Sequence, residues 1–132
     1  MNLFVDSSAL FSILDRTEDR HAAADAFFSE ALAARHHLIS HNYVIAEAAA
    51  LAQRRLGSVA ANSLLLRFPP LLELVWVSPD IHDAAVAAFV ASPSRGVSLV
   101  DRVSFEVMRR EGIQVAFAFD ADFITAGFRT VP

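Results

Sequence analysis

The sequence predicts an α/β fold in which helices cover both faces of a parallel sheet. Two observations predict it. Short apolar runs alternate along the chain with longer, alanine-rich segments of helical composition. The first run, Asn2–Val5, is almost wholly apolar and stops at Asp6, which is typical of a strand buried on both faces. The chain has 132 residues, so we expect one domain over residues 1–132.

The elements alternate in order along the first half of the chain. After the first strand we expect a helix at Ser7–Leu14, a polar turn at Asp15–Asp19, a helix at His21–Arg35, a strand at His37–Ser40, and helices at Asn42–Leu56 and Val59–Phe68. Gly57 is placed to end the third of these helices, because glycine accepts the left-handed conformation common at helix ends. Pro69 and Pro70 stop the fourth.

The second half continues the same alternation. The expected elements are a strand at Leu74–Val77, a helix from Ser78-Pro79-Asp80 to Ala91, a loop at Ser92–Gly96, a helix at Ser98–Arg110, a strand at Val115–Phe119, an acidic turn at Asp120, and an edge strand at Phe128–Val131. Pro79 is tolerated because it falls in the first turn of its helix.

Composition excludes several classes of protein. All eleven basic residues are arginine and the chain contains neither lysine nor cysteine, which excludes P-loop NTPases, Schiff-base chemistry, disulfides and thiolate metal sites. The net charge of −4 argues against a generic basic protein that coats nucleic acid. The longest uncharged stretches are about eleven residues, against the roughly 20 of a membrane span, and the start lacks the basic segment of a signal peptide. We therefore expect a cytoplasmic protein without a membrane partner.

Four acidic residues stand out when the architecture is considered: three lie where it forms a crevice, outside the carboxyl ends of parallel strands, and the fourth can reach the crevice from a crossover helix. Asp6 follows the first strand, Asp101 begins a helix, and Asp120 follows the fourth strand, with Asp122 two residues later. Glu47 is the only charged residue between His41 and Arg54, on an otherwise apolar helix.

Each of these acids also has a purely structural interpretation. Asp6 suits a helix N-cap, Asp101 resembles the partner of Ser98 in a capping box, Asp120 and Asp122 suit a turn, and Glu47 could face solvent. Brought together, however, the carboxylates would repel one another and lose hydration, so cations would have to neutralise them. Oxygen ligands without histidine or cysteine favour Mg²⁺ or Mn²⁺, and such a site suits hydrolysis of a phosphodiester.

Several motifs together resemble those of a known family. They are Asp6-Ser-Ser-Ala, Glu47 in its alanine-rich helix, Ser-Leu-Val-Asp101 before Ser104-Phe-Glu-Val-Met, and Phe119-Asp120-Ala-Asp122-Phe123. In this order and spacing the chain resembles a PIN domain, and among PIN domains it is similar to the VapC-type toxins of bacterial toxin–antitoxin pairs. The resemblance implies a three-layer α/β/α fold with a five-stranded parallel sheet in the order 3-2-1-4-5.

The resemblance also implies an Mg²⁺- or Mn²⁺-dependent endoribonuclease toxin, inhibited by a VapB-like antitoxin and forming a homodimer. Its acidic quartet maps onto Asp6, Glu47, Asp101 and Asp120, with Asp122 as an accessory metal ligand. One departure is Ala118, where relatives often carry threonine or serine.

Neighbouring residues complete the expected site. Ser7 and Ser104 stand next to quartet members and could orient carboxylates. Without lysine, contacts to the RNA backbone fall to arginine, and the candidates in or near predicted loops are Arg16, Arg20, Arg95 and Arg102.

Two other functions stay open from sequence. One is a housekeeping RNA-processing or flap-type nuclease with the same site. The other is a non-catalytic acidic module that binds a cation or a basic partner.

Overall fold

Five parallel strands form one sheet in the expected order β3-β2-β1-β4-β5. The computed structural model describes residues 1–132, and its strands are β1 (Asn2–Val5), β2 (His37–His41), β3 (Glu73–Val75), β4 (Val115–Phe117) and β5 (Arg129–Val131). β1 lies at the centre, where Phe4 pairs with Ile39 of β2 on one side and Ala116 of β4 on the other. Residues that follow β1 and β4 are therefore neighbours at one edge of the sheet.

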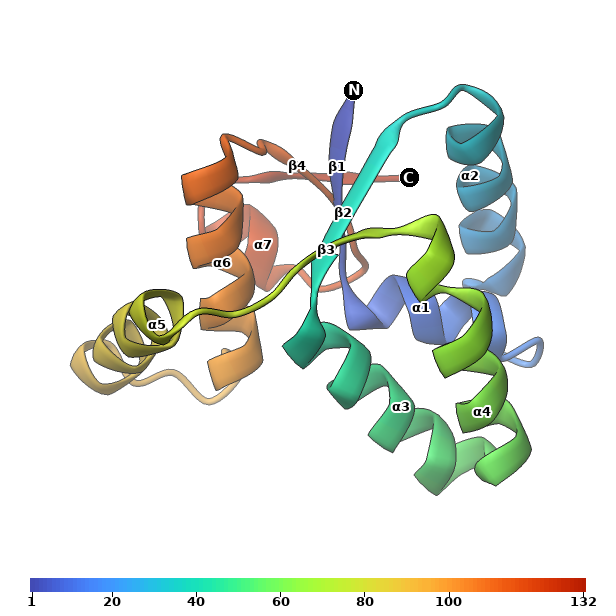
Figure 1. The fold of residues 1–132 in the computed structure, drawn as a ribbon, viewed down its shortest axis with the longest axis horizontal. Coiled ribbons are helices and arrows are strands. Elements are labelled where there is room, and N and C mark those ends of the chain that lie inside the picture. Colours follow the sequence, from blue (N-terminus) through green and yellow to red (C-terminus); the bar gives the residue numbers. More distant parts are fainter.

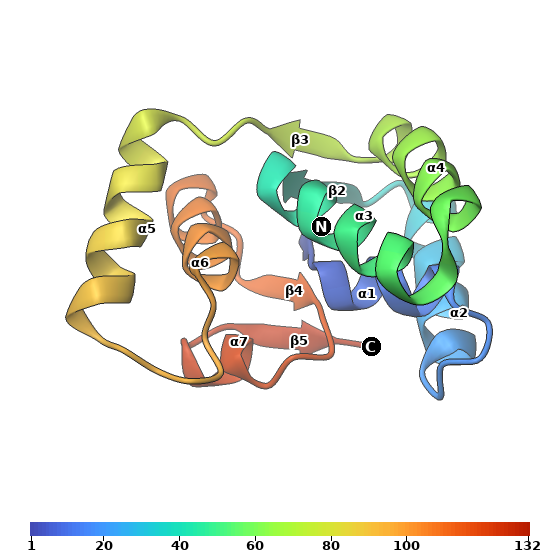
Figure 2. The same ribbon diagram turned by 90° about the horizontal axis from the view of Figure 1, so that it is seen from below.

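Helices cover both faces of this sheet. They are α1 (Ser7–Leu14), α2 (His21–Ala33), α3 (Asn42–Leu56), α4 (Ser58–Arg67), the 3₁₀ turn η1 (Pro69–Leu71), α5 (Pro79–Ala91), α6 (Leu99–Glu111) and α7 (Asp122–Thr125). Figure 1 shows β1 and β2 descending towards the first turns of α1 and α3. In Figure 2 the strands form a column, with α5, α6 and α7 on one side and α2 and α4 on the other. None of these helices combines the length and the apolar character needed to cross a lipid bilayer.

Aromatic side chains join the strands to the last helices. The rings of Phe105 on α6 and Phe123 on α7 meet edge to face at 5.1 Å, and Phe123 also contacts Phe4 of β1 at 6.0 Å. All three side chains are buried. Because Phe123 directly follows Asp122, this packing fixes the segment that carries the last two acidic residues.

Two strands end earlier than the sequence predicts, because their backbone turns towards side chains. The Val77 amide donates to Asn42 Oδ1 at 2.7 Å, and β3 ends at Val75. The Phe119 amide donates to Ser8 Oγ at 3.1 Å, and β4 ends at Phe117. In both cases a backbone amide donates to a side chain at the start of a helix instead of to a neighbouring strand. The helix is α3 for Val77 and α1 for Phe119.

Other boundaries differ in smaller ways. α2 stops at Ala33 rather than Arg35, because Arg35 adopts a left-handed conformation with φ 57°. The segment after Asp120 was expected as a turn only, but it continues into the short helix α7. Pro69 and Pro70 do end α4, and they also begin η1, since proline suits the first positions of a helix.

We expect Phe123→Ala to lower the free energy of unfolding by about 3–5 kcal/mol, because it leaves a cavity between β1 and α6. Urea denaturation followed by circular dichroism measures this. Ile124→Ala is the matched control, since the Ile124 side chain is 59% exposed, and its effect should stay within about 0.5 kcal/mol. Equal losses for the two variants would contradict the packing described here.

Candidate active site

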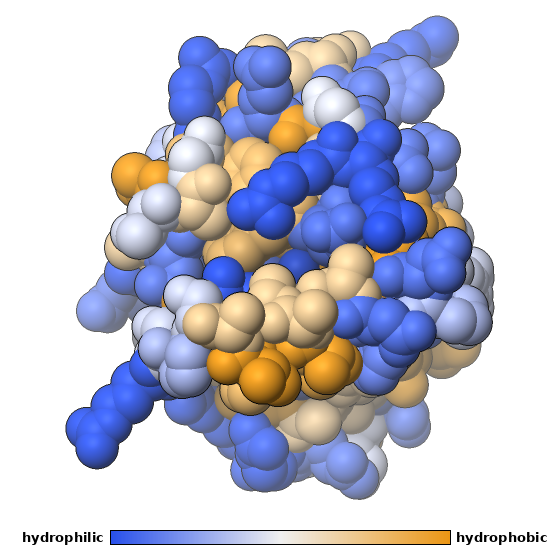
Figure 3. Space-filling model, turned by 90° about the vertical axis from the view of Figure 1, so that its left-hand side faces the viewer, coloured by the Kyte–Doolittle hydropathy of each residue, from blue (hydrophilic) through white to orange (hydrophobic).

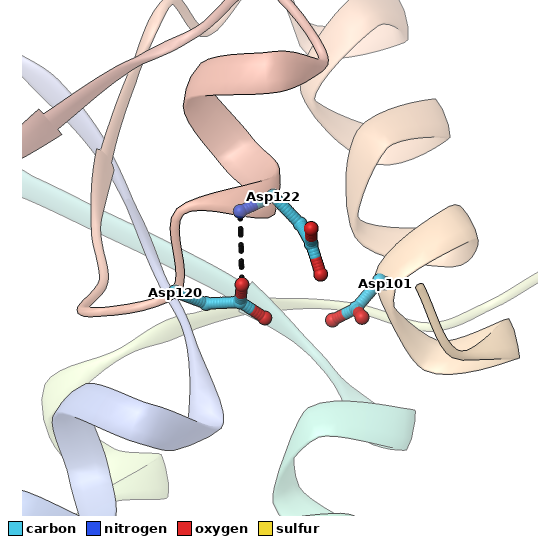
Figure 4. Close-up of side chains that lie close together, drawn as sticks. All are labelled: Asp101, Asp120 and Asp122. Carbon is cyan, nitrogen blue, oxygen red and sulfur yellow. Dashed lines mark hydrogen bonds between the residues drawn. The ribbon is translucent and has the colours of Figure 1, made fainter. Parts of the chain in front are cut away.

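The five acidic residues singled out by the sequence converge at the carboxyl edge of the sheet. Asp6 is the N-cap of α1, Asp101 lies in the first turn of α6, and Glu47 lies on α3. Asp120 follows β4, and Asp122 begins α7. Asp101, Asp120 and Asp122 each offer one oxygen within 4.8 Å of the others, and Figure 4 shows Asp101 and Asp122 pointing towards each other. Asp6 and Glu47 lie close enough to Asp101 to interact electrostatically with it.

Four of these carboxylates are held through one oxygen only. Asp6 Oδ2 accepts from the Ser8 amide at 3.2 Å and from Ser8 Oγ at 2.7 Å. Glu47 Oε1 accepts from Ser7 Oγ at 2.6 Å, Asp101 Oδ2 from the Ser98 amide at 2.9 Å, and Asp120 Oδ1 from the Asp122 amide at 2.9 Å.

The second oxygen of each of these four carboxylates accepts no hydrogen bond from the protein. None of these free oxygens is sealed from solvent, since the one buried side-chain polar atom without a partner is Nε of Arg102. The protein thus orients each carboxylate and leaves it one atom with which to bind a ligand.

The capping interpretations of Asp6 and Asp101 are correct, and they do not compete with a role in the site. Ser98 and Asp101 form the full capping box, with Ser98 Oγ accepting from the Asp101 amide at 3.1 Å. Glu or Gln is the usual acid or amide partner in such a box. The shorter Asp101 side chain fills the same role here while staying close to the helix start, where the other carboxylates gather.

Burial shifts the acid–base equilibria of the cluster. Loss of hydration raises the pKa of Asp6 to about 7 and that of Asp101 to about 6. The Asp101 carboxylate adds to the shift at Asp6, and Asp120 and Glu47 add to the shift at Asp101. The pKa of Asp122 is raised by partial desolvation and by the adjacent Asp120. Negative charge is therefore costly at this edge of the sheet.

No cationic side chain neutralises the cluster. The only pairs of a basic and an acidic side chain within 4.0 Å of each other are His37–Glu73 and Arg110–Glu106, and neither involves the five acids. Five carboxylates without an ion-pair partner, four of them with a free oriented oxygen, fit a divalent cation with hard oxygen ligands. The donor set contains no histidine and no sulfur, so it does not resemble a zinc site.

The three serines near the cluster have different partners. Ser7 orients Glu47, as expected. Ser8 holds Asp6 and, through its contact with the Phe119 amide, connects the ends of β1 and β4. Ser104 does not contact a carboxylate, because its hydroxyl donates to the Val100 carbonyl at 3.0 Å and interacts with His41 Nε2 at 2.8 Å.

His41 has a structural role that sequence reasoning did not assign. Its Nδ1 accepts from the Val44 amide at 3.2 Å, which caps α3, so the proton resides on Nε2 and is donated to Ser104. Burial lowers the pKa of His41 to about 3, so the ring is neutral. The hydrogen bonds through His41 and Ser104 join the start of α3 to α6, and these two helices carry Glu47 and Asp101. Its position directly after a strand and before a helix is the one signal for this role.

The four arginines expected to contact RNA occupy different places. Arg20 lies over the Phe119 ring at 5.1 Å from its centroid, one residue from Asp120. Arg102 donates to the Ser92 carbonyl at 2.9 Å, and its charge partly offsets the rise in the pKa of Asp122. Arg95 is exposed in the loop before α6, and Arg16 lines a cavity at the far end of α1.

Comparisons with known proteins agree with this geometry. The model of the PIN domain family matches residues 3–129. The protein named 23S rRNA-specific endonuclease VapC20, from two Mycobacterium tuberculosis strains, is 33% identical over 127 residues, which cover 96% of this chain and 95% of that protein.

Solved structures share the fold. The crystal structure of Mycobacterium tuberculosis VapC20, described as a sarcin–ricin loop cleaving toxin, superposes with a TM-score of 0.85 at 32% identity, covering 96% of this chain and 95% of VapC20. FitAcB from Neisseria gonorrhoeae has a TM-score of 0.69 at 12% identity, covering 100% and 97% of the two chains, which is a likeness of fold alone. With a family model that spans almost the whole chain and a relative one third identical, this chain belongs to the PIN domain family.

Proposed function

We propose that this protein is a metal-dependent endoribonuclease and the toxin of a toxin–antitoxin pair. The observation that carries the proposal is the cluster of Asp6, Glu47, Asp101, Asp120 and Asp122, which has no ion-pair partner and keeps free oxygens. The likeness to VapC20 supports RNA as the substrate. The same likeness makes 23S rRNA the first substrate to test, and an antitoxin the expected inhibitor.

In this proposal some residues hold the cation and others orient the residues that hold it. Asp6, Glu47, Asp101 and Asp120 hold Mg²⁺ or Mn²⁺, with Asp122 as a further ligand. Ser7 and Ser8 keep Glu47 and Asp6 in fixed orientations, so little rearrangement is needed when a cation binds. A divalent ion held there supplies positive charge that polarises a phosphodiester and activates water for hydrolysis.

Of the two other functions considered from sequence, the non-catalytic acidic module fits the structure less well. An acidic module that only binds a basic partner does not require one oriented and one free oxygen on each of four carboxylates. A housekeeping nuclease with the same site remains the second candidate, and it is separated from a toxin by its substrate. Because the proposed substrate is RNA, we place the activity in the cytoplasm.

We also propose that the protein forms a homodimer. Apolar side chains remain exposed on α5, where Val90 is 69% exposed, and beside β3, where Trp76 is 72% exposed. Figure 3 shows a band of hydrophobic side chains across the face that α5 presents, flanked by hydrophilic ones. Burial of such surface favours association.

We expect the protein to elute as a particle of twice its chain mass of 14.4 kDa. Size-exclusion chromatography with light scattering at several concentrations measures this, because burial of exposed apolar surface should hold two chains together. A mass of one chain at every concentration would contradict the dimer.

We expect Asp6→Asn and Asp101→Asn to reduce RNA cleavage by roughly a hundredfold or more, because each removes charge that holds the cation while keeping a hydrogen-bond acceptor for the helix cap. Cleavage of 23S rRNA with Mg²⁺ or Mn²⁺, followed by mapping of RNA ends, measures this. Asp83→Asn, an exposed position on α5, is the control. Full activity of either site variant would exclude the catalytic assignment.

We expect the cation-free protein to lose thermal stability as the pH rises from about 4 to about 7. In this range the folded chain keeps protons on Asp6, with a pKa of about 7, and on Asp101, with a pKa of about 6, that the unfolded chain has released. The unfolded chain binds only one extra proton, on His41, whose pKa of about 3 keeps it neutral in the folded chain, so rising pH favours unfolding. Added Mg²⁺ should raise the melting temperature more at pH 8 than at pH 5, because it binds the ionised carboxylates.

Differential scanning fluorimetry with a chelator or with Mg²⁺ tests both effects. Asp6→Asn should flatten the pH dependence, whereas Asp83→Asn should leave it unchanged. A melting temperature of the wild type that rises with pH in the presence of chelator would be inconsistent with a desolvated carboxylate cluster.

A further inference from the structure

A second polar cavity lies at the other end of α1 from the carboxylates. Its volume is about 360 Å³, and it opens between the end of α1, the start of α2 and the end of α4. Arg16, His21, Asp25 and Arg67 provide its polar walls, and Ile13 and Phe68 are buried beneath them. None of these residues belongs to the acidic cluster.

The arginines of this cavity have no carboxylate partner. Arg110 is the only one of the eleven arginines in the chain with an acidic group within 4.0 Å, although the chain contains fifteen acids. Asp25 lines the same cavity as Arg16 and Arg67 but is not within that distance of either. The cavity therefore holds two guanidinium groups and one carboxylate, a net positive charge that an anion would neutralise.

The walls of the cavity are fixed by contacts of their own. His21 Nδ1 donates to the carbonyl of Ser12 at 2.9 Å, which joins the start of α2 to α1. Phe68 is buried against Phe28 of α2, with ring centroids 5.8 Å apart. A ligand would therefore enter a formed hollow and would need to order only the two arginine side chains.

The cavity and the carboxylates lie at the two ends of one short helix. α1 begins at the Asp6 cap and ends at Leu14, and eight residues of helix span roughly 12 Å at about 1.5 Å per residue. In Figure 2, α1 leads from the middle of the molecule towards its connection with α2. Arg20, stacked on Phe119 beside Asp120, directly precedes His21 and so lies between the two sites.

We propose that the cavity lined by Arg16, His21 and Arg67 binds a backbone phosphate of the RNA, a few nucleotides away from the bond that is cut. This proposal rests on the ribonuclease function proposed above. Stacked nucleotides rise about 3.4 Å each along a strand, so roughly 12 Å corresponds to three or four nucleotides. Guanidinium groups suit this ligand, because their planar donors match two phosphate oxygens at once.

An acidic segment of a protein partner is the other possible anion. The position of Arg20 favours RNA, because a guanidinium stacked on the half-buried Phe119 ring beside Asp120 provides a further phosphate contact between the cavity and the acidic cluster. A line of separate cationic contacts that leads away from a catalytic centre is suited to a chain with regularly spaced charges.

The test compares two double variants that remove the same charge. Arg16→Gln/Arg67→Gln changes the cavity, whereas Arg110→Gln/Arg129→Gln changes arginines at the opposite edge of the sheet, where α6 ends and β5 begins. Steady-state cleavage of RNA and binding of RNA by the same variants in an Asp6→Asn background are measured over a range of salt concentrations. Circular dichroism checks that each variant is folded.

We expect the cavity variant to raise KM roughly tenfold with little change in kcat, because the lost contacts are remote from the bond that is cut. The slope of log binding constant against log salt should fall by about 0.7 for each phosphate contact removed from a single strand. The dependence of the rate on Mg²⁺ concentration should not change. The control variant should show none of these effects, apart from a small decrease in the long-range electrostatic attraction between the protein and the RNA.

Three results would overturn the proposal. One is an equal effect of the two double variants, which would indicate only the loss of overall charge. The second is that the wild type cleaves RNA and that the cavity variant has the same KM and the same salt dependence of binding as the wild type. The third is unchanged RNA binding combined with lost binding of an oligoglutamate peptide, which would assign the cavity to an acidic protein segment. Failure of the wild type itself to cleave RNA would instead refute the function proposed above.

A chemical probe locates the contact independently. Single methylphosphonate linkages, which are uncharged, are placed in turn along a short RNA substrate. An uncharged linkage at one position, a few nucleotides from the cut, should weaken binding to the wild type. The same linkage should not weaken binding to Arg16→Gln/Arg67→Gln, because that variant has already lost the contact with this phosphate. Additive effects at every position would exclude a phosphate in this cavity.

Discussion

Mutual repulsion among partly dehydrated carboxylates is the constraint on which the arrangement of this molecule depends. Asp6 and Asp101 are almost fully buried, and no basic side chain pairs with them. Hydrogen bonds offset part of this free-energy cost, because Asp6 and Asp101 each accept from a backbone amide at a helix start and Glu47 accepts from the hydroxyl of a neighbouring serine. The chain's fifteen acids exceed its eleven arginines by four, which equals the size of the proposed quartet.

The elements that carry the acids are positioned by neutral contacts. The hydrogen bonds through His41 and Ser104 hold α3 and α6 together without adding a charge, because burial keeps the imidazole unprotonated. Ser8 does the same for β1 and β4. A cationic side chain at either place would stabilise the cluster and also occupy it. Neutral donors instead preserve the negative potential that a divalent ion requires.

The strand order could be expected from the motifs of a known family, and the acidic residues could be singled out from local patterns together with those motifs. Asp6 and Asp101 could be interpreted in two ways at once, as caps and as candidate ligands, since an aspartate at a helix start suits both roles. The early ends of β3 and β4 could not be predicted, because they depend on the distant partners Asn42 and Ser8. The role of Ser104 was misjudged for the same reason: its partner His41 lies 63 residues away in the chain.

The placement of β4 beside β1 also has a consequence for biosynthesis. The contact between Ser8 and Phe119 closes a loop of 111 residues, and Asp120 joins the cluster only through β4. A polypeptide emerging from the ribosome would form β1, β2, β3 and their helices first, since folding during synthesis begins at the N-terminus. Until β4 follows, the nascent chain lacks Asp120 and Asp122 and has only part of the acidic cluster. Under the proposed function, the chain therefore becomes able to cleave RNA only late in its own translation, once β4 and α7 have been made.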